Sequence, residues 1–297
     1  MKLVNYSSLN KRFASYLAPQ ALVFLGVLIS VLLLSAIIFR QSLAFAYDSW
    51  GSYSGYNHGA LVVLVWIVLL IRLAPSAGSK QIGEKASILL FTFLAFFILF
   101  FLYRLSVILS FEFAQQITMA SAIMLAVFLT HGGLNLGQAL ILLAFLFCGL
   151  PVWDSSAGFL QEWTVSVTQS ALSAINMPSL VYGPYVEIPS GTFVIAEGCS
   201  GLRYSLAALA IATFYAATSL HRTGHRLVIV VLAISLSLIA NWVRVISIVW
   251  IGHVTEMKSA LIDDHYFFGW VLFGIALVPI FLIGRVFENR EFVDAAA

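Results

Sequence analysis

Long apolar runs separated by short polar segments dominate this chain. Eight runs have the composition and approximate length of helices that cross a bilayer. They lie at about residues 20–39, 60–74, 86–103, 117–130, 136–152, 202–220, 227–250 and 269–284. The pattern predicts an all-α integral membrane protein with about eight transmembrane helices, organised as a single polytopic membrane domain over residues 1–297.

The longest polar segment, residues 153–199, carries two weaker patterns. In Phe159–Ile175 the apolar residues follow helical spacing, which predicts a helix lying in the membrane interface. In Tyr182–Ile195 the residues alternate in polarity, and Pro189-Ser190-Gly191 predicts the turn of a small β-hairpin. We expect this insertion to present Cys199 at the mouth of the next span.

Composition and charge agree with this class and orient the chain. Hydrophobic residues make up 61% of the sequence and charged residues only 9%, whereas soluble domains carry about 25% charged residues. The mean hydropathy is +1.00. With eight spans both termini lie on one side, and ten of the 15 Lys and Arg residues fall on that side. The positive-inside rule therefore predicts cytoplasmic termini and an extracytoplasmic insertion at residues 153–199.

The two cysteines, Cys148 and Cys199, lie in such different settings that they argue against a disulfide framework. Cys199 belongs to the stretch Glu197-Gly198-Cys199-Ser200-Gly201-Leu202-Arg203. Interpreted as a helix start, this stretch places the thiol at the positive end of a helix dipole, and Arg203 faces back toward it. Both effects favour the thiolate, which is the reactive form. The alternative is a buried structural cysteine at a helix terminus.

Two further groups are expected on the same outer face. Arg244 lies near the end of the seventh span, with Asn241 one helical turn before it. His265 precedes the eighth span, and Asp263 or Asp264 would orient it. A thiolate that attacks a carbonyl, an imidazole that protonates a leaving amine and a guanidinium that stabilises an oxyanion form a chemically complete set. The alternatives are an arginine that snorkels to the interface and a histidine that is simply solvated.

These motifs resemble the exosortase/archaeosortase family of integral membrane proteins. The resemblance covers about residues 50–284 and is tightest over 194–274, the expected catalytic core. It is carried by the Cys199 stretch, Asn241-Trp242-Val243-Arg244-Val245, His265 with Gly269-Trp270, and Tyr56-Asn57-His58-Gly59. The pattern looks most like the bacterial exosortase A branch. Many members of that branch carry a soluble C-terminal domain that we expect this chain to lack, so its role would be absent or supplied by another protein.

The resemblance implies a membrane-embedded cysteine protease or transpeptidase in the cell inner membrane. Its partners would be the bilayer and exported proteins that end in a sorting tail: a Pro-Glu-Pro-type motif, one transmembrane helix and a basic end. The implied catalytic residues, facing the extracytoplasmic side, are Cys199, which forms a thioester, Arg244 and His265. The accessory candidates are Arg203, Asn241, Asp264 and His58, of which Arg203 would stabilise the thiolate or bind a substrate carboxylate. No cofactor, metal or nucleic acid is implied.

Three other functions remain open from the residues alone. A transporter of an anionic solute would use Arg203 and Arg244, but it would also place polar residues near the bilayer midplane. A non-catalytic component of an exopolysaccharide or protein export system would leave Cys199 structural. A zinc-dependent hydrolase is disfavoured because the chain has no His-Glu-x-x-His motif.

Overall fold

A computed structural model describes the backbone of residues 19–51, 55–72, 86–131, 134–263 and 265–296. Side chains are described for residues 25–51, 55–72, 93–130, 134–262 and 267–294. The chain divides into two compact units. One comprises Met1–Ser49 and Gly59–Val152, and the other comprises Trp50–His58 and Trp153–Ala297.

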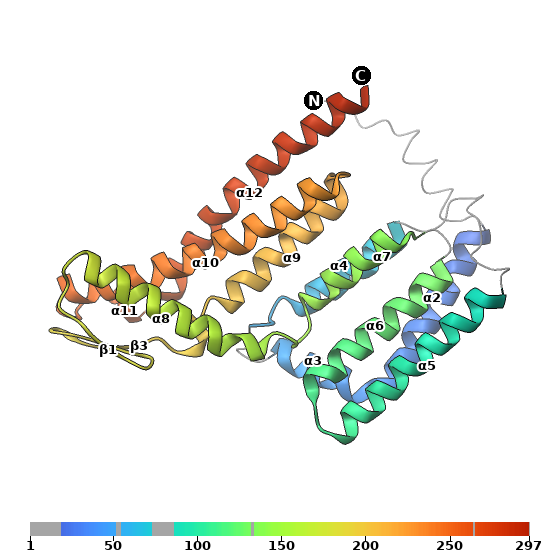
Figure 1. Ribbon diagram of the computed structural model, residues 1–297, viewed down its shortest axis with the longest axis horizontal. Helices are drawn as coiled ribbons and strands as arrows, with labels where there is room; N and C mark the ends of the chain where they lie inside the picture. The colour runs from blue at the N-terminus through green and yellow to red at the C-terminus, as the bar shows by residue number, and fades with distance from the viewer. Residues whose placement is uncertain (1–18, 52–54, 73–85, 132–133, 264, 297) are drawn as a thin grey trace. The chain divides into compact units, whose positions relative to one another are not determined.

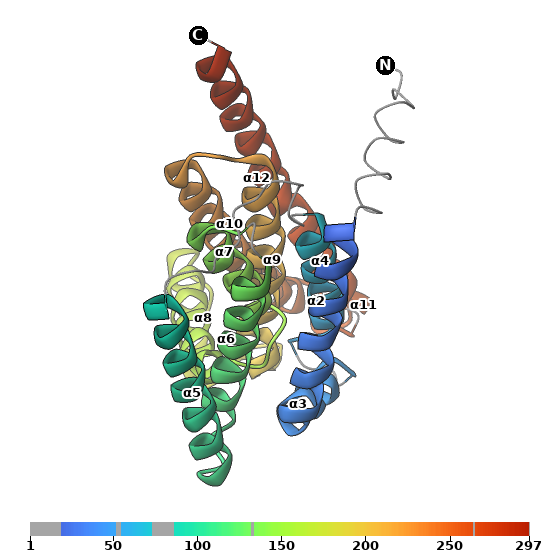
Figure 2. The same ribbon diagram turned by 90° about the vertical axis from the view of Figure 1, so that its right-hand side faces the viewer.

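The first unit is a set of apolar helices. Their bounds are α2 Pro19–Ile38, α3 Arg40–Gly51, α4 Gly59–Arg72, α5 Ala86–Ile108, α6 Glu112–His131 and α7 Leu136–Phe147. The pair α5 and α6 lies side by side, joined by a short turn (Figure 2). Helix α6 also packs against α2 and α7, and α7 packs against α4. Apart from α3, these helices coincide approximately with the first five apolar runs of the sequence.

A buried polar cluster explains two differences from the sequence prediction. The residues around Tyr47 lie outside the predicted apolar runs, yet α3 includes them and continues to Gly51 after a bend of 91° from α2. Ser42 of α3 is fully buried and lies within hydrogen-bond distance of the Tyr103 hydroxyl, at 3.2 Å. Its carbonyl accepts a hydrogen bond from Gln116 Nε2 at 2.9 Å. Helices α5 and α6 supply these partners, so the expected connector at residues 104–116 is largely helical as well.

The second unit carries the last three apolar runs and the polar insertion. Its elements are η1 Asp154–Ser156, α8 Ala157–Ala174, β1 Leu180–Tyr182, β2 Tyr185–Ile188, β3 Gly191–Val194, η2 Glu197–Cys199, α9 Leu202–Ser219, α10 Thr223–Val254, α11 Ala260–Asp263 and α12 His265–Ala296. Helices α9 and α12 both run alongside the central α10 (Figure 1). Their core contains many alanines: Ala208, Ala212, Ala216 and Ala233. Small side chains let helix backbones approach closely, as is typical of membrane helix packing.

The insertion forms the predicted helix but a larger sheet than predicted. Helix α8 ends where Asn176 adopts a positive φ of 56°. The expected two-stranded hairpin is instead a three-stranded antiparallel sheet in the order β1-β2-β3. The predicted turn at Pro189-Ser190 joins β2 to β3, and a second turn at Gly183-Pro184 adds β1. One face of the sheet packs Val186, with no exposed surface, into a core cluster shared with α8 and α10.

Membrane-spanning character is clear for part of the described chain. Three helical segments are long and apolar enough to cross a bilayer: Glu112–Thr130, Thr223–Val254 and Phe267–Asp294. The bent pair Leu25–Ile38 and Arg40–Gly51 passes the same test as one broken span. Gly59–Arg72, Phe93–Ile108 and Leu136–Phe147 are shorter apolar helices. The count of eight spans, the single polytopic domain and the cytoplasmic termini stay predictions.

A carboxylate of α12 ties together the ends of the three long helices of the second unit. The buried Glu291 accepts hydrogen bonds from the backbone N–H groups of His221 at 2.6 Å and Arg222 at 3.0 Å. It also lies 2.7 Å from the Nδ1 atom of His225. The two amides belong to the turn between α9 and α10, so Glu291 satisfies donors that the start of α10 leaves unpaired.

We expect Glu291→Gln to destabilise the protein, because an amide accepts these hydrogen bonds more weakly than a carboxylate. The loss should be about 1–2 kcal/mol, or a fall in thermal midpoint of roughly 2–8 °C for a chain of this size. Thermal unfolding in detergent measures it. Glu288→Gln on the exposed face of the same helix is the matched control. Equal midpoints for the two variants would contradict the proposed role of Glu291.

Candidate functional site

Cys199 lies in a short 3₁₀ turn and not in the first turn of α9. Its N–H donates to the Ala196 carbonyl at 2.8 Å, and the Ser200 N–H donates to the Glu197 carbonyl at 3.0 Å. Gly201 then adopts a φ of +92°, which separates η2 from α9. The sequence expectation that Cys199 starts α9, with Arg203 facing back from one helical turn later, is therefore wrong. The left-handed residue breaks the helical register between them.

Side chains of α8 hold this turn from one side. Gln161 Nε2 donates to the Ile195 carbonyl at 2.7 Å, just before the turn. Thr164 Oγ1, which has no exposed surface, donates to the Ser200 carbonyl at 3.2 Å. Carbonyls in an irregular segment find no partner in their own backbone ladder, and leaving one buried and unpaired is costly. Helix α8 supplies those partners and thereby fixes the backbone on both sides of Cys199.

Asn241 of α10 holds the turn from the other side. Its Nδ2 atom donates to the Cys199 carbonyl at 2.8 Å. A Cβ atom on Gly201 would lie only 3.1 Å from this Nδ2 atom, so the amide is packed directly on the glycine. Asn241 is 1% exposed, and its Oδ1 atom is buried with no hydrogen-bond partner among the described residues. The nucleophile turn is thus clamped between α8 and α10.

Arg244, three residues further along α10, is a buried cation. Its side chain is 4% exposed, and its Nε atom has no hydrogen-bond partner among the described residues. Within the same residues no carboxylate lies at ion-pair distance from it. The Tyr204 ring lies 5.7 Å from its Cζ atom, which gives a cation–π contact. A buried, unpaired guanidinium is costly, so this geometry favours a ligand that brings negative charge.

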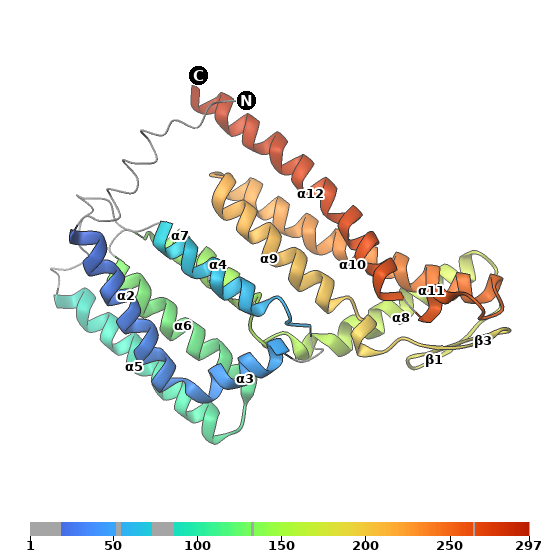
Figure 3. The same cartoon turned by 180° about the vertical axis from the view of Figure 1, so that it is seen from behind.

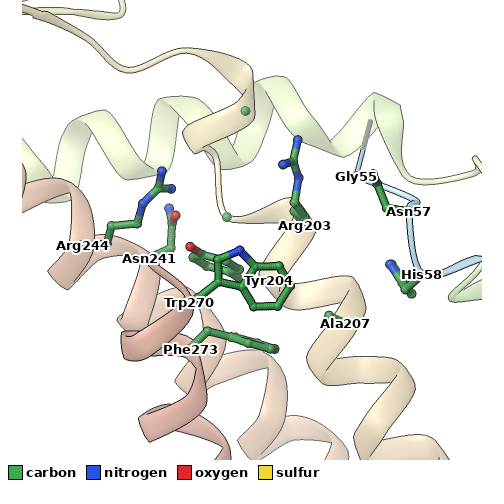
Figure 4. Close-up of a pocket in the computed structure, with 12 residues that line it drawn as sticks. Gly55, Asn57, His58, Arg203, Tyr204, Ala207, Asn241, Arg244, Trp270 and Phe273 are labelled. Atoms are coloured by element: carbon green, nitrogen blue, oxygen red, sulfur yellow. The ribbon is translucent and has the colours of Figure 1, made fainter. Parts of the chain in front are cut away.

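A pocket of about 190 Å³ collects several sequence candidates. Figure 4 shows Arg203 and Arg244 on either side of it, with Asn241 next to Arg244 and His58 at the far side. The remaining lining residues are Gly55, Asn57, Gly198, Gly201, Tyr204, Ala207, Trp270 and Phe273. No acidic side chain is found among the described residues that line this pocket, and these residues place two guanidinium groups and an imidazole over an aromatic floor.

A second, smaller pocket of about 110 Å³ contains Cys199 itself. Arg244 also lines it, so the arginine borders both pockets. The other lining residues are apolar and come from the β3 region, α10 and α11: Phe193, Val194, Ile195, Val245, Ile248, Val249 and Ile262. The structure therefore brings Cys199 and Arg244 to one apolar cavity.

The third catalytic candidate lies where only the backbone is described. His265 is the first residue of α12, and Asp264 lies outside the described residues. A Cβ atom on Gly269 would come within 3.0 Å of Arg244 Nε and would also collide with the Tyr204 hydroxyl. Gly269 thus faces the site, and position 265, four residues earlier, falls on the same face of α12.

The segment that carries His58 is fixed by a buried tyrosine. Tyr56 is 1% exposed, and its hydroxyl accepts a hydrogen bond from the Trp153 N–H at 3.0 Å. Burial raises the pKa of Tyr56 above its ordinary value, and the Asp154 charge acts in the same direction. The phenol therefore stays neutral at physiological pH and anchors the loop against α9 through contacts with Leu202.

Sequence reasoning missed three aromatic residues of the site. Tyr204 directly follows Arg203, but its ring lies under Arg244, a placement that depends on how α9 packs on α10. Trp270 entered the sequence analysis only as part of the Gly269-Trp270 motif, without a role in a site, and it lines the larger pocket with Phe273. The Phe273 ring stacks on Tyr204 at 5.2 Å between centroids. Only the Gly-Trp pair that opens the eighth run offered a signal.

One of the comparisons with known proteins finds a match. A family model described as transmembrane exosortase matches residues 50–282, which include both pockets and position 265. Neither a curated protein nor a solved structure matches the chain.

We expect Gly201→Ala to disrupt the nucleophile turn, because an L-residue at this positive φ is strained by about 1–3 kcal/mol and its methyl group meets Asn241. The alkylation rate of Cys199 and the thermal midpoint should both change. Gly198→Ala is the matched control, since its Cβ atom would meet nothing within 4 Å. A Gly201→Ala variant that alkylates and melts like Gly198→Ala would refute the clamp.

Proposed function

We propose, from the premise that this chain belongs to the transmembrane exosortase family, that it is a membrane-embedded cysteine protease/transpeptidase. It acts on exported proteins that end in a C-terminal sorting tail, and it forms a thioester on Cys199. The observation that carries the proposal is the shared apolar pocket of Cys199 and the buried Arg244. The exosortase A type, the inner-membrane location and the extracytoplasmic active site belong to the same proposal.

Arg244 is the best available oxyanion donor. Many cysteine and serine enzymes use backbone N–H groups at the nucleophile to stabilise the tetrahedral intermediate. Here the N–H groups of Cys199 and Ser200 already donate to the Ala196 and Glu197 carbonyls. Arg244 carries several donors and a fixed charge beside Cys199, and Tyr204 together with the surrounding helices keeps it dry. Removing water strengthens the attraction between this charge and a developing oxyanion.

The reaction then follows from the roles of three residues. The Cys199 thiolate attacks the scissile carbonyl carbon, and the negative charge moves to the oxygen that faces Arg244. His265 donates a proton to the leaving nitrogen, the C–N bond breaks, and the tail departs as an amine. The acyl group remains on sulfur as a thioester. An amine or a water molecule attacks the thioester, gives up a proton to His265 and so restores its charge, and releases the Cys199 thiolate.

The larger pocket supplies accessory groups for the same reaction. Arg203 and His58 line it opposite Arg244, and two guanidinium groups in one pocket support binding of a substrate carboxylate there. Asn241 positions the nucleophile through the Cys199 carbonyl. Asp264 is proposed to orient His265. A substrate tail that spans the same bilayer reaches this site by lateral diffusion, which raises its effective concentration.

We expect a co-expressed reporter that ends in a Pro-Glu-Pro-type tail to lose that tail when the wild-type protein is present. Cys199→Ala and His265→Gln should abolish cleavage, and Arg244→Gln should slow it by about 10²- to 10³-fold, as loss of an oxyanion donor does. Immunoblotting of the reporter and mass spectrometry of its new C-terminus measure this.

Cys148→Ala is the matched cysteine control, because Cys148 is buried, belongs to the first unit and is not among the residues that line either pocket. It should cleave like the wild type. Cleavage that survives Cys199→Ala would overturn the catalytic role of the thiol and favour a non-catalytic component of an export system. If the wild type cleaves neither this reporter nor a library of tails randomised in the motif, the protease proposal fails.

A further inference from the structure

Strand β3 has a free edge. It is the last strand in the order β1-β2-β3, so only one of its sides is paired. The Ile195 N–H donates to the Pro184 carbonyl at 2.8 Å, which fixes the pattern of the antiparallel ladder. Backbone groups alternate between the two sides of a strand. Those of Thr192 and Val194 therefore point away from β2, and no backbone hydrogen bond joins either residue to another described segment.

The free edge leads directly to the nucleophile. Only four residues lie between Val194 and Cys199, and the apolar pocket of Cys199 is lined by Val194, Ile195 and α10 residues. The Val194 side chain lies on the outward face of the sheet, opposite to the buried face of Val186, and it is 54% exposed. The cavity is lined by residues of both β3 and α11, and these two elements lie near each other in Figure 3.

We infer that substrate binds by adding a strand to β3, an inference that rests on the proposed function. An extended segment of the substrate pairs with the outward N–H and C=O groups of Thr192 and Val194. Alternate side chains of an added strand point into pockets on one face. One such side chain enters the cavity lined by Val245, Ile248 and Val249, beside Cys199.

The lining defines the kind of substrate that this subsite takes. Apart from Cys199 and Arg244, every lining residue in the described part of the chain is aliphatic or aromatic. An apolar side chain gains free energy on entering it, whereas a polar one loses its hydration. The substrate residue next to the scissile carbonyl should therefore be apolar, while Arg244 faces the carbonyl oxygen.

Proline at Val194 tests the strand pairing, because it removes the outward N–H and leaves the β2–β3 ladder intact. Val181→Pro is the matched control. The register pairs Tyr182 with Tyr185 at a turn, so the Val181 backbone points to the opposite edge of the same sheet. We expect Val194→Pro to lower the kcat/KM for reporter cleavage at least tenfold, and Val181→Pro to change it less than twofold.

Alkylation of Cys199 by iodoacetamide reports the integrity of the site without substrate. Equal alkylation rates in the wild type and both proline variants show that the nucleophile turn is intact. Under that condition, Val194→Pro activity equal to wild type overturns the strand inference while leaving the protease proposal in place. If the wild-type protein shows no cleavage that depends on Cys199, the proposed function itself fails. Failure of the strand inference and failure of the protease proposal are therefore distinguishable.

Two further measurements identify the occupant. In a Cys199→Ser variant that holds the reporter uncleaved, a photoreactive amino acid at position 192 should crosslink to the reporter. A photoreactive amino acid at position 180, on the other edge of the sheet, should not. Crosslinking to a second copy of this chain, or to lipid alone, would overturn substrate docking at β3.

Replacing Ile248 with Trp to fill the cavity should shift the preference for the residue next to the scissile bond, in a series of reporters, from Leu toward Ala. An unchanged preference would also overturn the inference.

Discussion

The hydrogen bond from Asn241 to the Cys199 carbonyl links the proposed nucleophile to α10, the helix that carries the buried cation Arg244. Asn241 and Arg244 are three residues apart on α10, so they lie on one helix face. The same face of α10 therefore both holds the turn that carries Cys199 and presents the Arg244 guanidinium. Gly201 makes the link possible, because any side chain there would displace the Asn241 amide. Because Asn241 is buried, little water competes for this hydrogen bond, which therefore holds its geometry well.

The buried guanidinium explains why the rest of the unit is built as it is. Burying a charge without a partner is unfavourable, and the packing around Arg244 has to supply the missing free energy. The alanine-rich contacts of α9 with α10 do so together with the stacked Tyr204 and Phe273 rings. Gly269 lets α12 approach Arg244 closely enough to complete the enclosure. In the proposed reaction, the negative charge that develops on the substrate oxygen offsets the unfavourable free energy of burying the Arg244 charge. Because the cation is already in place before the reaction, it lowers the barrier without having to reorganise.

The sequence predicted those features that depend on local pattern. Eight apolar runs became helices because hydrophobic length determines helix formation in a bilayer. Asn241 was found from its spacing to Arg244, and His58 from its motif, and both line the pocket with Arg203. The features that it missed depend on tertiary contacts. Helix α3 has a loop-like composition but is held by the Ser42 cluster.

The break at Gly201 separated Cys199 from Arg203 for a similar reason. A glycine in a helical pattern does not by itself predict a positive φ. The turn depends on the hydrogen bonds that Thr164 of α8 and Asn241 of α10 donate to the Ser200 and Cys199 carbonyls. Regular secondary structure is therefore readable from this sequence, whereas the irregular segment at the nucleophile is not. Catalytic segments commonly depart from local preference in this way.

Arg244 borders both pockets, and this position divides the site into two chemical halves. On the side of β3 the surroundings are apolar and include the thiol. On the side of α9 they contain Arg203, His58 and an aromatic floor. A tetrahedral intermediate on Cys199 would have its oxygen at the boundary, where the charge is fixed. The acyl segment of the substrate would lie in the apolar half, and its polar groups would lie in the half with Arg203 and His58. Arg244 would then contact the reacting oxygen during both formation and breakdown of the thioester. One cation can serve both half-reactions because neither half requires it to move.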